Sequence, residues 1–204
     1  MDSPTLDRFV GSYLIGSCGI LSITRDGEQL SAQMSGQPKL PIYPETPPKF
    51  RWRTINAQVT FAIENGRPAT SATIRQGAGE VVATRLDETA TRAIEAKLAN
   101  RIREQLPLPG SEAAVQKFFA DMKTGAPSYG DMTKALRELV RHQLPALAAK
   151  AQGIQSVKFK GVSEAGADNY MVTYHDGQQS HCLVDLDGDG KIALLAFLPK
   201  FSYL

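Results

Sequence analysis

The chain has 204 residues, of which 42% are hydrophobic and 22% charged, a balance typical of proteins that fold around an apolar core. A net charge of only +2, with Lys and Arg scattered along the chain, argues against a nucleic-acid partner. No window reaches the ~18 apolar residues that a membrane span needs. The first residues lack a basic-then-apolar signal pattern, so we expect a cytosolic chain or the mature part of a trimmed precursor.

The first 86 residues read as about eight short strands separated by tight turns. Residues 19–34 alternate apolar and polar side chains on either side of Asp26-Gly27, a dipeptide typical of hairpin turns. Further turns are expected at residues 64–66 and 77–79. Many evenly spaced strands are typical of an up-and-down antiparallel barrel or a sandwich, and closing a barrel removes exposed sheet edges.

From residue 87 the apolar period becomes helical. Ile94, Leu98, Ile102 and Leu106 recur every four residues and predict a helix that ends at Pro107. A second helix is predicted over residues 111–123, and a third over residues 132–151. For the second helix, Ser111 is the expected N-cap and the expected core face is Val115, Phe118, Phe119 and Met122. Pro145 lies inside the third helix and is expected to kink or split it.

After Gly153 the strand pattern returns, and helices followed by a four-stranded meander indicate an α+β unit. The expected strands are residues 156–162, 169–175, 181–186 and 191–197. The pattern therefore predicts the fold class all-β plus α+β: a small barrel or sandwich joined by a helix to helices with a four-stranded antiparallel sheet. We divide the chain into a barrel domain at 1–87, a connector helix and linker at 88–110, and an α+β domain at 111–204.

Two resemblances cover most of the chain. The segments LDRFVGSY, LSITRDGEQL, SGQPKLPIYPE and NAQVTF resemble the lipocalin-like domain of unknown function found C-terminal to class C β-lactamase-like serine hydrolases. The segments RHQLPAL, SVKFKGV and ADNYMVTYHDG resemble an accessory module of the nuclear transport factor 2-like, cystatin-related type. The first resemblance implies that the all-β domain is a small up-and-down antiparallel β-barrel. Together the resemblances imply a non-catalytic accessory protein of bacterial origin, periplasmic or secreted, whose partner is a hydrolase domain, a second copy or a small apolar ligand.

A search for catalytic motifs yields no assignment and no cofactor. No Ser has a Lys three residues on, as S-x-x-K enzymes require, and no G-x-S-x-G elbow exists. Lys123-Thr124-Gly125 spells K-T-G, but at a predicted helix end rather than on a strand. His175 and His181 flank a turn expected to place His175 opposite Ser180. His181 and Cys182 point to opposite faces of a strand, which argues against a shared metal.

Aromatic residues give the ligand-binding candidates. The aromatic residues of the barrel either line a small apolar cavity or fill the core. They are Tyr13, Tyr43, Phe50, Trp52 and Phe61. Phe50 and Trp52 alternate with Arg51 and Arg53, which are expected to face outward. In the α+β domain, Tyr170 and Tyr174 share a face and Asp168 begins their strand. The resemblance to cone-shaped folds makes Asp168, Tyr170 and Tyr174 candidates for proton transfer. The alternative, which we favour, is a core lined by aromatic residues with Asp168 at the turn.

The segment VDLDGDGK and the two cysteines each leave two interpretations. Asp185, Asp187 and Asp189 begin like a calcium loop, but position 12 is Ala196 and both flanks are strands, which favours a hairpin turn over a calcium site. Cys18 and Cys182 form either one bridge or, as we favour, two buried thiols.

The sequence therefore favours a binding protein. The alternatives are a small-molecule carrier that uses the barrel cavity, and an enzyme with a site in the α+β domain.

Overall fold

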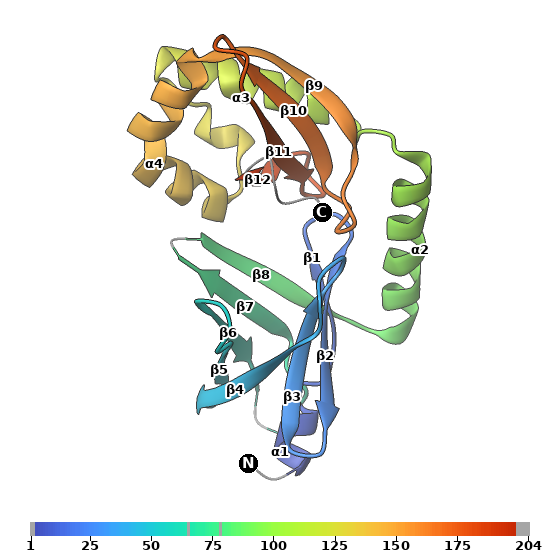
Figure 1. Ribbon diagram of the computed structural model, residues 1–204. Helices are drawn as coiled ribbons and strands as arrows, with labels where there is room; N and C mark the ends of the chain where they lie inside the picture. Colours follow the sequence, from blue (N-terminus) through green and yellow to red (C-terminus); the bar gives the residue numbers. More distant parts are fainter. Residues whose placement is uncertain (1–2, 65, 78, 199–204) are drawn as a thin grey trace. The chain divides into compact units, whose positions relative to one another are not determined.

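The computed structural model describes residues 3–64, 66–77 and 79–198 (Figure 1). The chain divides into two compact units, Met1–Asn100 and Arg101–Leu204. Helix α2, Glu88–Glu104, crosses this boundary. Within the described residues, none of the helices combines the length and the hydropathy needed to cross a bilayer.

The first unit is a closed barrel of eight antiparallel strands, as the sequence predicts. The strands follow one another around the barrel in chain order, and β8 closes it against β1 with Tyr13 opposite Arg85. A short helix, α1 (Ser3–Asp7), precedes them. The strands are β1 Gly11–Ile15, β2 Gly19–Asp26, β3 Gln29–Met34, β4 Leu40–Thr46, β5 Lys49–Arg51, β6 Ala57–Ala62, β7 Ser71–Gln76 and β8 Gly79–Leu86.

The turn at Asp26-Gly27 is confirmed. Asp26 pairs with Gln29, and Gly27 has a φ of 57°, the left-handed conformation that such a loop requires. The turns predicted at 64–66 and 77–79 include Asn65 and Ala78, which lie outside the described residues.

Arg85 ties β8 to β1 and to a neighbouring loop. Its guanidinium donates to Tyr13 Oη at 3.0 Å, to the Ala69 carbonyl at 3.2 Å and to the Val10 carbonyl at 2.6 Å. Gly11 lies against the guanidinium with a φ of 151°, and a Cβ there would stand 2.8 Å from Arg85 Nη2. Both the backbone conformation and the close approach of Arg85 therefore require glycine at this position.

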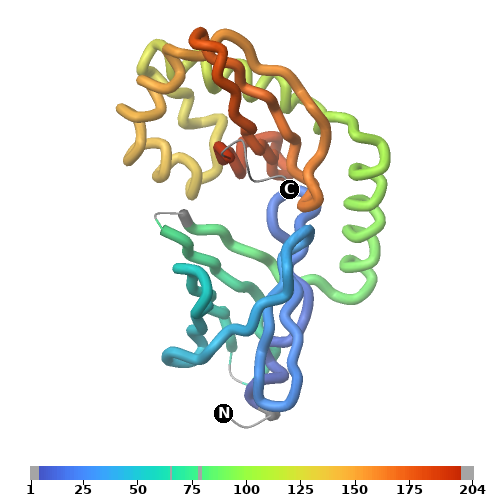
Figure 2. Tube along the Cα trace, in the orientation of Figure 1, coloured from blue at the N-terminus to red at the C-terminus, as the bar shows by residue number. Residues whose placement is uncertain are grey.

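The second unit packs two helices on one face of a four-stranded antiparallel sheet (Figure 2). The sheet order is β12-β11-β10-β9, the predicted meander. Val115, Phe118, Phe119 and Met122 are all buried, which confirms the predicted core face. The elements are α3 Ser111–Thr124, the short 3-10 helix η1 Tyr129–Asp131, α4 Lys134–Gln152, β9 Ile154–Val162, β10 Asp168–Tyr174, β11 Gln179–Leu186 and β12 Ile192–Leu198.

Two helix predictions need correction. Ser111 is not the N-cap of α3, because Gly110 occupies that position with a φ of 83° and the Ser111 hydroxyl turns inward. Of the two outcomes expected at Pro145, the split does not occur: α4 begins after Thr133, whose hydroxyl caps Leu136 N, and continues past Pro145 to Gln152.

The apolar stripe predicted for α2 is not a buried face. No described residue of α2 is buried, Ile102 is 37% exposed, and Leu106 lies beyond the helix end and is 62% exposed. Side chains four residues apart rotate by about 40° per step around a helix. Four such residues therefore spread over about 120°, a wider stripe than a strict heptad seam, and on α2 none of them is buried.

The β10–β11 hairpin has a different register from the predicted one. Ser180 pairs with Val172, not with His175, and His181 pairs with Met171. Tyr174 N donates to the Gln178 carbonyl, which leaves a three-residue loop of His175, Asp176 and Gly177. Gly177 has a φ of 79°, and a glycine in this conformation is typical of three-residue hairpin loops.

We predict that Arg85→Met lowers the free energy of unfolding of the barrel by about 2 kcal/mol, because it leaves Tyr13 Oη and two carbonyls without their charged donor. Trp52, the single tryptophan, lies in the barrel core, so its fluorescence in a urea titration reports on this unit. Arg75→Met is the control: it breaks an exposed ion pair with Glu80 and should cost less than about 0.5 kcal/mol. Equal effects of the two substitutions would contradict the structural role of Arg85.

Candidate functional site

A pocket of about 280 Å³ opens in the second unit between α3, η1 and the β11–β12 turn. This volume approaches the lower limit of the ~300–1,000 Å³ typical of small-molecule sites. The lining residues are Ala114, Lys117, Phe118, Asp121, Ser128, Gly130, Asp131, Met132, Asp189, Gly190, Lys191 and Ile192. The pocket therefore combines apolar side chains with five charged ones.

The apolar side of the pocket belongs to the core of the unit. Phe118, Met132 and Ile192 are each 2% exposed. Met132 forms a parallel bridge with Ile192, and Thr133 N donates to the Ile192 carbonyl at 3.0 Å. These backbone contacts hold the segment before α4 against the start of β12, so the apolar side has a fixed position.

Lys117 organises the rim on the α3 side. Its ammonium donates to Asp131 Oδ2 at 2.8 Å, to Asp121 Oδ2 at 3.0 Å and to Ser128 Oγ. The hydrogen bonds to Asp131 and Asp121 raise the pKa of Lys117, and the hydrogen bonds from Ser128 and Lys117 lower the pKa of Asp121. Lys117 therefore stays protonated near neutral pH and cannot act as a general base.

The β11–β12 turn supplies the opposite rim, and Asp185, Asp187 and Asp189 occupy different positions in and beside it. Asp187 Oδ1 accepts the N–H groups of Asp189 and Lys191 at 3.0 and 2.9 Å, so its carboxylate closes the turn. Asp185 is 7% exposed on its strand and accepts Leu186 N, while Asp189 reaches the pocket rim. Across residues 3–198, apart from positions 65 and 78, no three His, Cys, Asp or Glu side chains are arranged to hold a metal.

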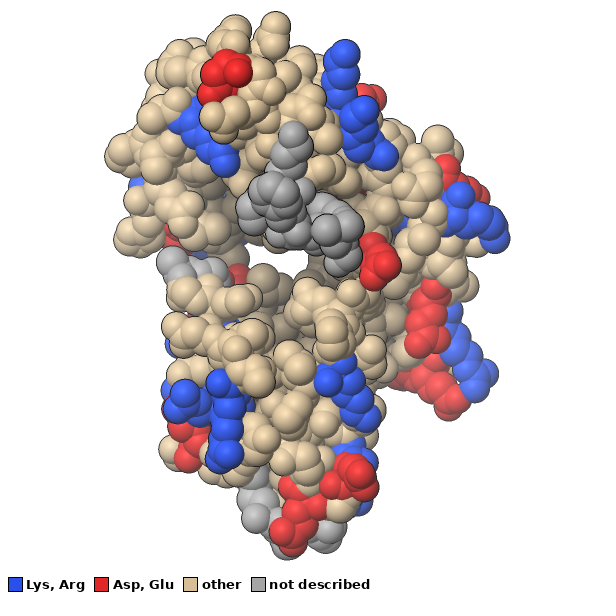
Figure 3. Space-filling model, in the orientation of Figure 1, with Lys and Arg blue, Asp and Glu red and all other residues tan. Residues whose placement is uncertain are grey.

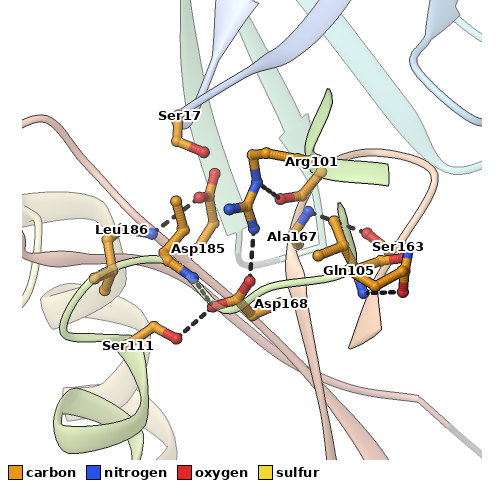
Figure 4. Close-up of polar contacts among 12 residues, drawn as sticks. Ser17, Arg101, Gln105, Ser111, Ser163, Ala167, Asp168, Asp185 and Leu186 are labelled. Carbon is orange, nitrogen blue, oxygen red and sulfur yellow. Dashed lines mark hydrogen bonds and ion pairs between the residues drawn. The ribbon is translucent and has the colours of Figure 1, made fainter. Parts of the chain in front are cut away.

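A second polar cluster surrounds Asp168 (Figure 4). Asp168 Oδ1 accepts Arg101 Nη2 at 2.6 Å, and Oδ2 accepts Leu108 N at 2.8 Å and the Ser111 hydroxyl. Ser111 Oγ also hydrogen-bonds Tyr170 Oη. The Asp168 side chain has no exposed surface and that of Arg101 is 12% exposed. Asp168 therefore begins β10, as the sequence predicts, and its side chain lies inside the core rather than in an exposed turn.

The Asp168 cluster has catalytic residue types but no access for a substrate. A serine hydroxyl bonded to a carboxylate is the pairing that activates nucleophiles. Here Ser111 and Asp168 are 0% exposed and Tyr170 is 1% exposed, and three donors already surround the carboxylate. The arrangement matches a fully satisfied buried charge, in which the loss of any one partner would be strongly destabilising.

The barrel candidates fill their own interior. The rings of Phe9, Phe50 and Phe61 stand 4.9–5.7 Å apart, and Tyr13 lies 5.9 Å from Phe61. All four are at most 1% exposed, and Trp52 joins the same core at 6%. Mutual contact of these side chains favours the filled core over a ligand cavity.

Tyr43 does not join the barrel core. Ile42 is the core residue at this point of β4, and Tyr43 follows it on the opposite face of the strand. The guanidinium of Arg53 stacks on the Tyr43 ring at 3.9 Å. The expected outward position of Arg51 and Arg53 is confirmed, since both are exposed.

The remaining candidates occupy ordinary structural positions. Tyr174 Oη and Ser180 Oγ form a hydrogen bond of 3.0 Å, and His181 Nδ1 and Asn169 Oδ1 form one of 2.9 Å. Cys18 and Cys182 are buried free thiols, as favoured from the sequence. Lys123 of the K-T-G segment lies in the last turn of α3, as predicted.

The sequence patterns do not identify the pocket residues on α3 and η1 as candidates for a binding site. Lys117 and Asp121 carry one local signal, the i,i+4 spacing of opposite charges on a helix. Asp131 follows a turn and has no such signal. On the face shown in Figure 3, basic side chains lie in small groups beside acidic ones, so charge alone does not mark a site.

Comparisons with known proteins give one partial similarity. A segment of 63 residues, 31% of this chain, is 29% identical to part of "Penicillin-binding protein 4*" from Bacillus subtilis (strain 168). The segment covers 14% of that protein, so the chain corresponds to a small share of its length. No family model matches the chain, and no solved structure matches it significantly. The link to β-lactamase-related proteins thus has partial support, and the two accessory-domain families stay predictions.

We predict that the second unit loses stability in alkali. Burial raises the pKa of Tyr170 from 10.0 to about 12 and that of Cys182 from 9.0 to about 12. The folded unit binds these protons more tightly than the unfolded chain, so their contribution is full below pH 9 and is lost as the pH rises to about 12. Urea titrations followed by helical circular dichroism should show this fall.

The control for this prediction separates the two groups. Tyr170→Phe should remove the part of the fall above pH 10, and Tyr43→Phe, outside the barrel core, should leave the profile unchanged. A Tyr170→Phe profile identical to that of the unsubstituted protein would contradict the assignment.

Proposed function

We propose that this protein is a non-catalytic, two-domain binding protein that works beside a serine-hydrolase-type catalytic domain. Its binding site is the pocket between α3, η1 and the β11–β12 turn. The partial similarity to a penicillin-binding protein supports the association with that class of hydrolase. The proposal extends to a periplasmic or secreted location, and to a hydrolase domain or a second copy as the protein partner.

One contrast carries the proposal. The residues with the types needed for covalent chemistry, Ser111, Asp168 and Tyr170, are closed off from solvent and bonded to one another. The charged side chains around the pocket, by contrast, border an open volume beside fixed apolar side chains. A concave site with an apolar side and a few convergent polar groups is the usual form of a small-molecule site.

The two alternative functions have less support. An enzyme built on Ser111 needs an opening that brings its hydroxyl to a substrate, and Ser111 is 0% exposed. A carrier built on the barrel needs space where the rings of Phe9, Phe50 and Phe61 meet. The pocket needs no rearrangement to admit a ligand.

The test is a titration of the ¹⁵N-labelled full chain with a library of small polar fragments, followed by amide shifts. We expect the bound fragments to shift the amides of Lys117, Asp131 and Gly190. Ala114→Leu places a larger side chain in the pocket and should abolish these shifts. Ala113→Leu, the neighbouring exposed position outside the pocket lining, should preserve them.

Two results would overturn the proposal. One is fragment binding elsewhere that Ala114→Leu leaves intact. The other is covalent labelling of the chain by a fluorescent penicillin that Ser111→Ala abolishes, which would show that the buried serine reacts. We expect no labelling, because the chain has no S-x-x-K sequence.

A further inference from the structure

Charges of both signs are left unpaired on one side of the pocket. Lys117 is held by Asp121 and Asp131, whereas Asp189 and Lys191 on the facing turn form no ion pair with any described residue. Both side chains are exposed, and Asp187 fixes their backbone N–H groups. Asp131 meets Lys117 through Oδ2 alone, which leaves Oδ1 as a second acceptor near the rim. A ligand in the pocket thus meets carboxylate oxygens and one ammonium group without a partner.

The size of the pocket limits the ligand. Liquid water takes about 30 Å³ per molecule. A volume of about 280 Å³ therefore holds about nine waters, or a ligand of about ten non-hydrogen atoms. The apolar surface of the pocket consists of the half-buried Ala114 and the accessible edges of Phe118, Met132 and Ile192, which are each only 2% exposed.

We propose that the pocket binds a small zwitterion, an apolar α-amino acid or a short dipeptide. Its ammonium group is placed against Asp189 and Asp131, its carboxylate against Lys191, and its side chain against the apolar surface. A simple anion would face three aspartates. A simple cation would leave Lys191 without a partner when the ligand excludes water from the rim, and unpaired charges in such places are costly. This inference rests on the proposed binding function of the pocket.

The test compares three ligands that share one apolar body. Leucine carries both charges, 3-methylbutylamine only the ammonium and 4-methylpentanoate only the carboxylate. Titration of the full chain by amide shifts should show leucine binding at least about tenfold more tightly than either analogue, because each analogue lacks one of the two charged groups that form charge-assisted hydrogen bonds. The shifted amides should include those of Asp189 and Lys191.

Matched variants assign the two charges. Lys191→Met should weaken leucine binding about tenfold and leave the amine unaffected, and Asp189→Asn should weaken leucine and the amine but spare the acid. Lys160→Met and Glu164→Gln, exposed positions outside the pocket lining, should change nothing.

The outcomes separate this inference from the function on which it rests. If fragments shift the pocket amides but leucine binds no more tightly than the amine, the zwitterion proposal is wrong and the binding function stands. If leucine and all library fragments leave the pocket amides unshifted, the proposed function is wrong as well. Loss of leucine binding in Lys160→Met would also contradict the assigned contacts.

Discussion

The second unit depends on one buried charge, the carboxylate of Asp168. It draws together the C-terminal part of α2 through Arg101, the following loop through Leu108 N, and the first turn of α3 through Ser111. Removing one partner of such a buried pair typically costs about 3–5 kcal/mol. The start of α3 is therefore anchored to β10, and this anchor sets where the rest of the helix lies on the sheet.

Helix α3 connects the buried cluster with the pocket. Its first residue, Ser111, turns inward to Asp168, and its apolar residues pack on the sheet. Lys117 and Asp121 project from its other side to the pocket rim. One helix thus places a closed polar cluster and an open charged rim in the same unit. The two sets of polar groups differ in their access to solvent. Those in the Asp168 cluster are enclosed and hold the fold together, whereas those at the pocket rim are open to a ligand.

The sequence predicts the fold far better than the site. Alternation around Asp26-Gly27 and along Phe50 and Trp52 reflects which face of a strand is buried, so about eight strands follow from local pattern. The choice of a barrel over a sandwich depends on the long-range pairing of β8 with β1, which local pattern does not give. Asp168 and Ser111 are 57 positions apart in the chain, and only the folded unit shows that their side chains meet. The loop aspartates were recognised as turn residues, but their placement at a pocket depends on α3 and on the segment before α4, which periodicity does not locate.

The most direct test of the structural role of Asp168 is native-state hydrogen exchange at the Leu108 amide. This residue lies in the loop between α2 and α3, and its N–H donates to Asp168. The account predicts exchange as slow as that of the core strands β10 and β11, because the amide opens only when the unit unfolds. Exchange as fast as that of the exposed Asp176 amide in the β10–β11 loop would contradict the claim that the Asp168 cluster is a closed structural anchor.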